Sequence, residues 1–196
     1  METMTKEKLS EVFFNVRKAY RLLFEYQSKI LSLAKFIGDY FSYSYSGGWP
    51  LLSNACPTKG KGRLENWAWD WLNMYAYAFH FGSKQIQEEN VIFEIRIYSD
   101  TGFYDSQTED PLKIEAFTRE NKSKTKIVLI ASNLNWDPNK LLENFNSKTN
   151  EYSIRNEEFN MCAKSYDLEE FLSEETTINA LKDFSEYCNK NNIKIR

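Results

Sequence analysis

The stretch NWAWDWLNMYAYAFHFG, residues 66–82, has an aromatic side chain at almost every odd position. The aromatic residues in it are Trp67, Trp69, Trp71, Tyr75, Tyr77, Phe79 and Phe81. A period of two is typical of a β-strand, in which successive side chains point to opposite faces, and aromatic residues favour strands. We predict a turn or half-strand at 66–71 and a strand from about Met74 to Phe81. A helix over 64–78 is the alternative, because Leu, Met and Ala favour helix.

Further strand patterns follow this one along the chain. VIFEIRIY, residues 91–98, alternates in the same way, and the polar segment 82–90 would join the two strands as a long hairpin loop. LKIEAF (112–117) and KIVLIAS (126–132) predict a second hairpin, and IVLIA is apolar on both faces, as in a central strand. Residues 153–166 predict one more strand.

A long helix is predicted before the sheet, over residues 5–41. A series of positions in it, apolar except for Gln27, follows 4-3 spacing, which places them on one stripe of a helix. They are Leu9, Phe13, Val16, Tyr20, Leu23, Gln27, Ile30, Ala34, Ile37 and Phe41. Such a helix would be about 50 Å long, so we expect part of it to project or to pack against a second chain. A break near Gln27–Ser28, giving a helical hairpin, is the alternative.

The remaining segments complete the predicted architecture. Asp137-Pro138 predicts a helix start, with the helix running to about Phe145, and Ser173 predicts the cap of a final helix. Strands flanked by helices indicate an α+β fold, here with an antiparallel sheet of about four to five strands and C-terminal helices packed on one face. We expect a single domain, 1–196, with a loop or hinge at 42–63 and an α+β body at 64–196. The aromatic residues of 75–81 would face the helical layer.

Composition narrows the class of protein. The chain has 196 residues, 42% of them hydrophobic, and a net charge of −3, which gives no strong attraction to nucleic acid or membranes. Residues 1–63 carry ten Lys and Arg against five Asp and Glu, so the first third is basic. Three widely spaced cysteines fit a reducing compartment, and the longest aliphatic run is too short to cross a bilayer. We therefore expect a cytoplasmic protein.

The residues needed for common catalytic chemistry are scarce. His80 is the single histidine, and its position in an apolar aromatic strand favours a structural role. Cys56 would be nucleophilic if Lys59 or Lys61 stabilised its thiolate. Neither Cys nor His occurs at the spacing of a zinc site. The sequence therefore predicts no metal and no cofactor, and it favours a protein that is not an enzyme over one that is.

One segment combines basic and aromatic residues. PTKGKGR, residues 57–63, lacks the complete phosphate-loop motif, but its glycines and cations suit an anion. Basic grooves with stacking aromatic residues hold single-stranded nucleic acid. A nucleic-acid or nucleotide-binding module is therefore one alternative function. Its binding residues would be Lys59, Lys61, Arg63, Trp67, Trp69 and Trp71.

A metal-dependent hydrolase or nuclease is the other alternative. It would use carboxylates on the predicted hairpins, Glu94, Asp100, Asp105 and Glu115. The order of charges does not match the common nuclease pattern, since Lys113 precedes Glu115 and Arg96 follows Glu94. Charged residues that alternate along a strand are usually on its solvent face, and that is the simpler expectation for Glu94 and Arg96.

The leading hypothesis is a binding or assembly protein without catalytic activity. The long 4-3 stripe would pair with a partner helix, most simply that of a second copy in a dimer. The residues expected at this interface are Phe13, Val16, Tyr20, Leu23 and Ile30.

Overall fold

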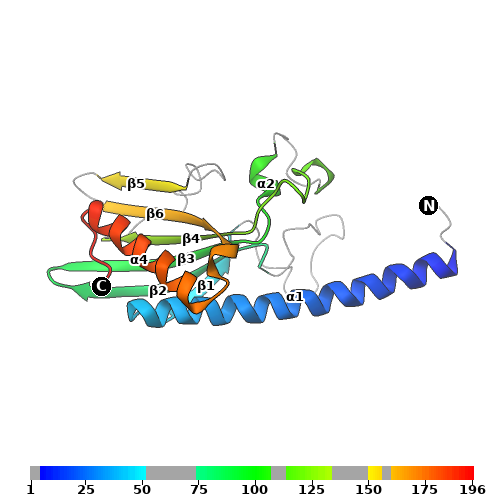
Figure 1. The fold of residues 1–196 in the computed structure, drawn as a ribbon, viewed down its shortest axis with the longest axis horizontal. Helices are drawn as coiled ribbons and strands as arrows, with labels where there is room; N and C mark the ends of the chain where they lie inside the picture. The colour runs from blue at the N-terminus through cyan, green and yellow to red at the C-terminus, as the bar shows by residue number, and fades with distance from the viewer. Residues whose placement is uncertain (1–4, 52–73, 107–113, 134–149, 156–159) are drawn as a thin grey trace, which may run out of the picture. The chain divides into compact units, whose positions relative to one another are not determined.

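The computed structural model describes residues 5–51, 74–106, 114–133, 150–155 and 160–196. It shows an α+β fold with a long N-terminal helix, an antiparallel sheet of six strands, and a C-terminal helix packed against the sheet (Figure 1). The predicted fold class is thereby confirmed. The chain divides into two compact units, Met1–Ile37 and Gly38–Arg196.

The first helix, α1, runs from Lys6 to Phe41 without a break. It is therefore one helix, as the 4-3 spacing predicts, and the alternative of a hairpin broken near Gln27–Ser28 is wrong. Ser28 and Ser32 are accommodated because each hydroxyl donates to the carbonyl oxygen four residues earlier, at 2.9 Å in both cases.

The sheet has the strand order β1-β2-β3-β4-β6-β5, and every neighbouring pair is antiparallel. Figure 1 shows β2, β3, β4, β6 and β5 side by side in this order. The strand bounds are Gly47–Pro50 for β1, Ala76–Ile86 for β2, Glu89–Tyr98 for β3, Lys126–Ser132 for β4, Glu151–Arg155 for β5 and Asn160–Asp167 for β6. All seven residues of β4 are buried, which confirms the prediction of a central strand at 126–132.

The hairpin of β2 and β3 differs from the predicted one. The segment 82–90 is mostly strand, and a two-residue turn, Gln87 and Glu88, replaces the predicted long loop. The pairing shifts between His80 and Ser83, where two residues of β2 face one of β3. This is a β-bulge, and Gly82 adopts a φ of +68° there, which glycine allows without strain.

Three other segments correct the sequence-based expectations. Residues 47–50, expected as loop, form the edge strand β1, in which Pro50 is tolerated because edge strands leave some N–H positions unpaired. Residues 114–116, expected within a strand at 112–117, form a 3-10 turn, η4 (Ile114–Ala116). The single strand expected at 153–166 is two strands, β5 and β6. The predicted helix at 138–145 lies outside the described residues.

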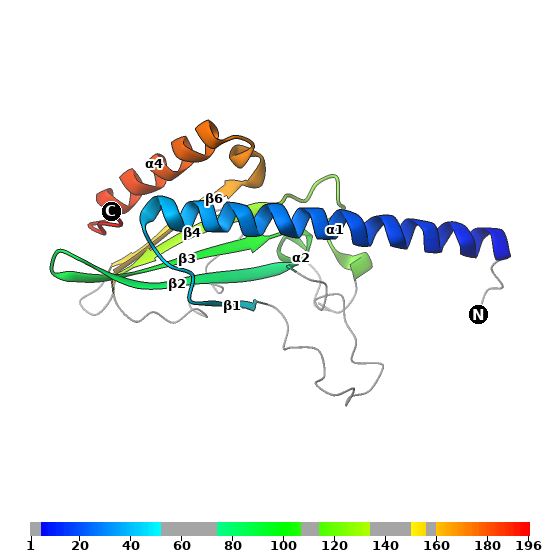
Figure 2. The ribbon, with the colours of Figure 1, turned by 90° about the horizontal axis from the view of Figure 1, so that it is seen from below.

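Two faces of the sheet differ in what covers them. The first, the α4 face, is covered by helix α4, Glu174–Lys190, which lies on one side of the strands in Figure 2. Phe184 of α4 contacts Phe93 of β3, with ring centroids 6.4 Å apart, and Phe41 at the end of α1 contacts both rings. This aromatic cluster is the centre of the core on the α4 face.

The C-terminal helix begins as the sequence predicts. Ser173 is its N-cap, and the Ser173 hydroxyl accepts a hydrogen bond from the Thr176 backbone N–H at 3.2 Å. Polar contacts also join α4 to β6: Lys164 Nζ lies 2.8 Å from Asp183 Oδ2, and the Tyr166 hydroxyl donates to the same oxygen at 2.7 Å. The short helix η5, Leu168–Phe171, connects β6 to α4.

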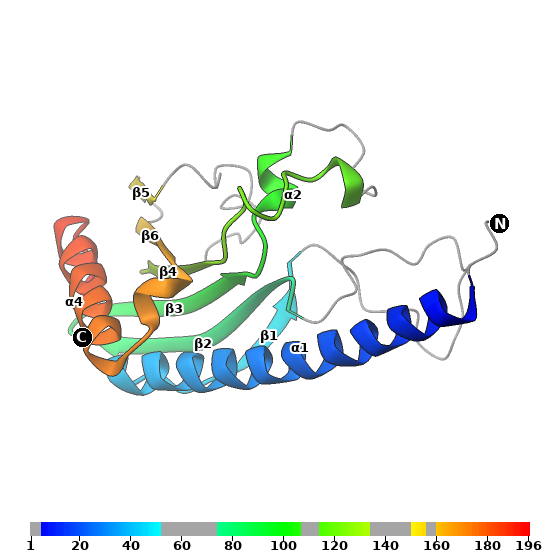
Figure 3. The ribbon, with the colours of Figure 1, turned by 45° about the vertical axis from the view of Figure 1, so that its right-hand side comes forward.

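The second face, the α2 face, is covered partly by helix α2, Gly102–Asp105, which follows the end of β3 (Figure 3). Phe103 and Tyr104 of α2, together with Phe117, pack against a core of apolar residues. This core consists of Tyr75, Ala76, Tyr98, Val128, Ile130, Met161 and Ala163.

The aromatic residues of the segment 75–81 therefore divide between the two faces. Phe79 and Phe81 are buried, and Phe81 lies 5.5 Å from Phe93 on the α4 face, as predicted. Tyr75 packs instead in the core of the α2 face, so the prediction that it faces the helical layer is wrong. The reason is that β2 begins only at Ala76, and Met74 adopts a φ of +58°, which ends the alternation before Tyr75.

Candidate functional site

The most unusual surface of the protein lies on the N-terminal part of α1. Large apolar side chains are exposed there, with exposed fractions from 38% for Leu9 to 72% for Phe24. Contiguous apolar surface on a folded protein indicates an interaction site. We name the following residues the apolar stripe: Leu9, Val12, Phe13, Val16, Tyr20, Leu23 and Phe24.

The stripe occupies one side of the helix. Leu9, Val16 and Leu23 recur every seven residues, and Phe13 and Tyr20 lie four residues after the first two, so all five share one face. The pattern continues through Ile30, Ala34 and Ile37, but these three are buried, with Ile30 only 2% exposed. The exposed surface therefore includes four of the five residues predicted for the interface, Phe13, Val16, Tyr20 and Leu23, and does not include Ile30.

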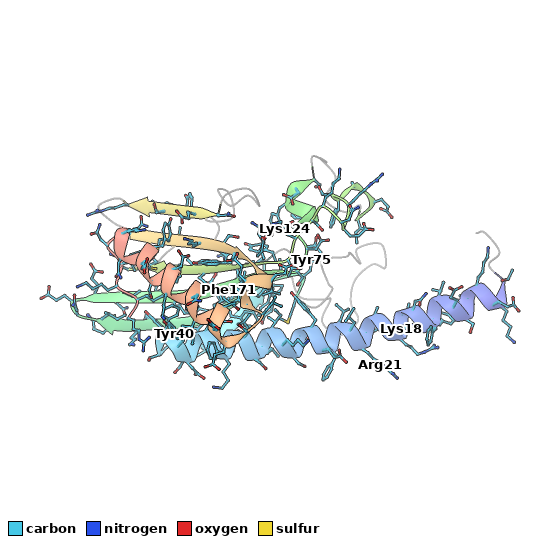
Figure 4. All side chains as sticks on the ribbon, in the orientation of Figure 1. Lys18, Arg21, Tyr40, Tyr75, Lys124 and Phe171 are labelled. Carbon is cyan, nitrogen blue, oxygen red and sulfur yellow. The ribbon has the colours of Figure 1, made fainter. Side chains whose placement is uncertain are left out.

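Charged residues lie mainly away from the stripe. The five residues that share the 4-3 line are bordered by Val12 and Ala19 on one side and by Ser10, Arg17 and Phe24 on the other. Of these five bordering residues, which we call the rim, only Arg17 is charged. Lys18 and Arg21 project from the N-terminal part of α1 in Figure 4, and Lys18 Nζ lies 4.4 Å from the centre of the Phe14 ring. Residues 6–29 carry six Lys and Arg against three Glu.

A second polar arrangement lies inside the sheet, on the α2 face. Glu94 and Arg96 of β3 are 1% and 0% exposed, and Arg96 Nε donates to Glu94 Oε1 at 2.6 Å. The expectation that these charges lie on a solvent face is wrong. A buried pair is tolerated because each charge neutralises the other. Removing one partner would destabilise the fold, because the interaction that offsets the burial of the remaining charge is lost. The sequence signal was present: two opposite charges, two residues apart, within an otherwise apolar run.

His80 extends this polar arrangement toward the surface. It lies opposite Glu94 in the β2–β3 register, with Nδ1 3.7 Å from Glu94 Oε2, and its ring centre is 5.8 Å from that of Trp49 on β1. Within the described residues, neither of those two atoms has a hydrogen-bond partner. Tyr98 lies two positions after Arg96 on β3. Burial raises the pKa of Tyr98, so its hydroxyl stays protonated at neutral pH.

Two of the other carboxylates considered for metal binding, Asp100 and Asp105, have structural contacts of their own. Asp100 Oδ1 accepts a hydrogen bond from the Gly102 N–H at 2.8 Å, and Asp105 Oδ2 accepts one from the Thr101 hydroxyl at 2.8 Å. Glu115 is exposed on η4. Across the part of the chain that the structure describes, no group of three or more His, Cys, Asp or Glu residues is placed to hold a metal ion. The hydrolase alternative gains no support from this geometry.

The basic-aromatic segment falls within residues 52–73, outside the described residues. Lys59, Lys61, Arg63, Trp67, Trp69 and Trp71 all belong to it, as does Cys56. The nucleic-acid alternative therefore stays a prediction. Two residues that the sequence did not single out are brought together on the α4 face, Cys162 and Cys188, whose Sγ atoms lie 3.3 Å apart. Their separation of 26 residues gives no motif that could have revealed the contact.

Comparison with known proteins places the chain in a family. The model of the PM0109 family matches residues 6–193, which include all of α1, the whole sheet and α4. The chain belongs to the PM0109 family. Searches of curated proteins and of solved structures gave no match. None of the helices in the described ranges has the length and apolar character that a membrane crossing needs.

Proposed function

We propose that the protein is a binding or assembly protein that associates with a second copy of itself through the apolar stripe of α1. The observation that carries the proposal is the exposure of the seven stripe residues along one face of a continuous helix. Exposed aromatic and aliphatic side chains in this number cost free energy in water, and a partner surface removes that cost.

The 4-3 spacing supports a helix as the partner. In a coiled coil, residues repeating every 3.5 positions insert between four residues of the facing helix. Leu9, Phe13, Val16, Tyr20 and Leu23 supply two full heptads of this pattern. The same stripe can face itself across a two-fold axis, so one surface suffices for both partners.

The available area also supports a second copy. With about 200 Å² for a fully exposed large side chain, the exposed fractions of the stripe residues correspond to roughly 700 Å² per copy. Two copies would bury about 1,400 Å², which lies within the range of stable protein interfaces. The rim supports this pairing too, because Val12, Ala19 and Phe24 are apolar and Arg17 is its single charged residue between positions 10 and 24.

The test uses two substitutions of the same kind, one residue apart. Leu23→Glu places a charge in the stripe, whereas Leu22→Glu places the same charge about 100° around the helix. Both leucines are exposed, at 40% and 67%, so both variants should fold. We would measure mass against concentration for the full chain by sedimentation velocity and native mass spectrometry.

We expect the parent protein and Leu22→Glu to be dimeric or larger at micromolar concentration. Leu23→Glu should be monomeric, or at least 100-fold weaker, because a buried unpaired carboxylate is costly. Circular dichroism should show equal helix content in both variants. A monomeric parent protein at tens of micromolar, or equal weakening by the two substitutions, would refute the proposal.

A further inference from the structure

Two cysteines meet between the sheet and the C-terminal helix. Cys162 lies on β6, on the α4 face, and Cys188 lies in the last turn of α4. Both are fully buried as free thiols, and the Cys162 thiol donates to Cys188 Sγ at 3.3 Å. No other contact in the described residues places two cysteine sulfurs together.

We propose that Cys162 and Cys188 are an oxidisable pair, a modification site at which a peroxide or a small disulfide forms an intramolecular disulfide. The Sγ atoms are about 1.3 Å farther apart than the 2.03–2.05 Å of a disulfide, so small side-chain rotations close the gap. This inference is independent of the self-association proposed for α1.

The reaction is a balanced two-electron oxidation. A thiolate of one cysteine attacks the peroxide oxygen to give a sulfenic acid and water, and the second thiol displaces a further water as the S–S bond forms. Overall, both thiols lose one hydrogen each, and one peroxide becomes two waters. With a small disulfide as oxidant, two exchange steps release two thiols instead.

The surroundings make this site slow to react. Burial raises the pKa of the Cys188 thiol well above its ordinary value, and the neighbouring Cys162 raises it further. Because the thiolate is the reactive form, the pair stays reduced under mild conditions and reacts faster as the pH rises. Access requires opening of the last turn of α4, which ends at Lys190, and of the following segment, whose Ile193 N–H donates to the Cys188 carbonyl oxygen at 2.9 Å.

The disulfide would tie the C-terminal helix covalently to the sheet. It would close a loop of about 26 residues, which restricts the unfolded chain. For a chain of this size, the expected rise in Tm is roughly 5–10 °C. Oxidation would thus raise the stability of the body without altering the exposed surface of α1.

The experiment counts thiols in the full-length chain carrying Cys56→Ser, which leaves only the proposed pair. The folded protein is treated with diamide or hydrogen peroxide at pH 7 and at pH 8.5. It is then denatured and labelled with a maleimide of known mass. Matched controls carry Cys56→Ser together with Cys162→Ser or with Cys188→Ser, so that each has one thiol.

We expect the reduced Cys56→Ser protein to take two labels and the oxidised protein none. The oxidation should be faster at pH 8.5 than at pH 7. The oxidised protein should remain one chain without reductant, with the linked peptides found by mass spectrometry, and dithiothreitol should restore both labels and the lower Tm. Each control should keep its single label or form only intermolecular dimers. Two labels after oxidation of the folded protein, or cross-linked dimers of the Cys56→Ser protein, would overturn the proposal.

Discussion

Phe13 in α1 and Phe93 in β3 are the same residue in opposite surroundings. Phe93 is 0% exposed and touches aromatic rings from α1, β2 and α4, whereas Phe13 is 52% exposed. The contrast holds for whole regions: the aromatic residues of the sheet lie in a packed core, and those of the stripe lie at the surface. An apolar residue in the first region serves folding, and one in the second is available for association.

The strongest test of this contrast is to remove each ring. Phe93→Ala should lower the free energy of unfolding by about 3–5 kcal/mol, because it leaves a cavity in a core that cannot fully collapse. Phe13→Ala should change it by less than about 0.5 kcal/mol in the monomer. Urea unfolding at low protein concentration measures the change in the free energy of unfolding for each variant. Equal losses for the two variants would mean that Phe13 is buried within its own chain. At higher concentration, Phe13→Ala should weaken self-association.

The second test concerns the charges within the core. Glu94→Gln should lower the free energy of unfolding by about 3 kcal/mol, because the buried Arg96 loses the carboxylate that lies 2.6 Å from its Nε. Glu89→Gln is the matched control, since Glu89 is exposed at the start of the same strand. Urea unfolding of both variants should separate them clearly. Similar small effects would mean that water reaches the Glu94–Arg96 pair.

Much of this architecture could be predicted from periodicity alone. The helix α1 and the strand β4 were predicted to within one residue, because long 4-3 spacing and an all-apolar run have few alternative explanations. The edge strand β1 could not be predicted, since its residues, GGWP, have weak strand propensity and pair only because β2 offers an open edge. The turn at Gln87 and Glu88 was missed because no turn motif marks it.

The candidate sites show a similar division. Phe13, Val16, Tyr20 and Leu23 lie on one exposed helical face, as the 4-3 spacing predicts, and their role at an interface stays a prediction. The burial of Ile30 could not be predicted, because one repeating pattern runs through both the exposed and the buried part of α1. The cysteine contact joins residues 26 positions apart, which periodicity does not report. The Glu94–Arg96 pair did leave a signal, two opposite charges within an apolar run.

Gly38 tests the close packing at the C-terminal end of α1. A Cβ at this position would lie 2.3 Å from a carbon of the Phe81 ring, which is too close without movement of the ring. Gly38→Ala should therefore destabilise the protein by about 1–3 kcal/mol, although alanine is the better helix former. The cost should shrink in a Phe81→Leu background, where the ring is absent. Equal costs in both backgrounds, from thermal or urea unfolding, would place the strain elsewhere.

The smallest expected effect lies at the surface of α4, at Asp183. Partial burial acts to raise the pKa of this carboxyl, but hydrogen bonds from Lys164 and Tyr166 outweigh it and hold the pKa below the ordinary value of 3.8. A lowered folded-state pKa contributes stability above the unfolded-state pKa, and that stability is lost as the pH falls through the folded-state value. The contribution is therefore complete at neutral pH and declines below about pH 5.

Asp183→Asn should remove this pH-dependent part. At pH 7 the loss should stay below about 1 kcal/mol, because the Asp183 side chain is 49% exposed and solvent screens its attraction to Lys164. Between about pH 5 and pH 2 the stability of the variant should fall less steeply than that of the parent protein. Glu186→Gln, an exposed change on the same helix, should leave the slope nearly unchanged. Parallel pH profiles for the parent protein and Asp183→Asn would show that the contact between β6 and α4 adds no stability, and that the apolar core alone holds α4 on the sheet.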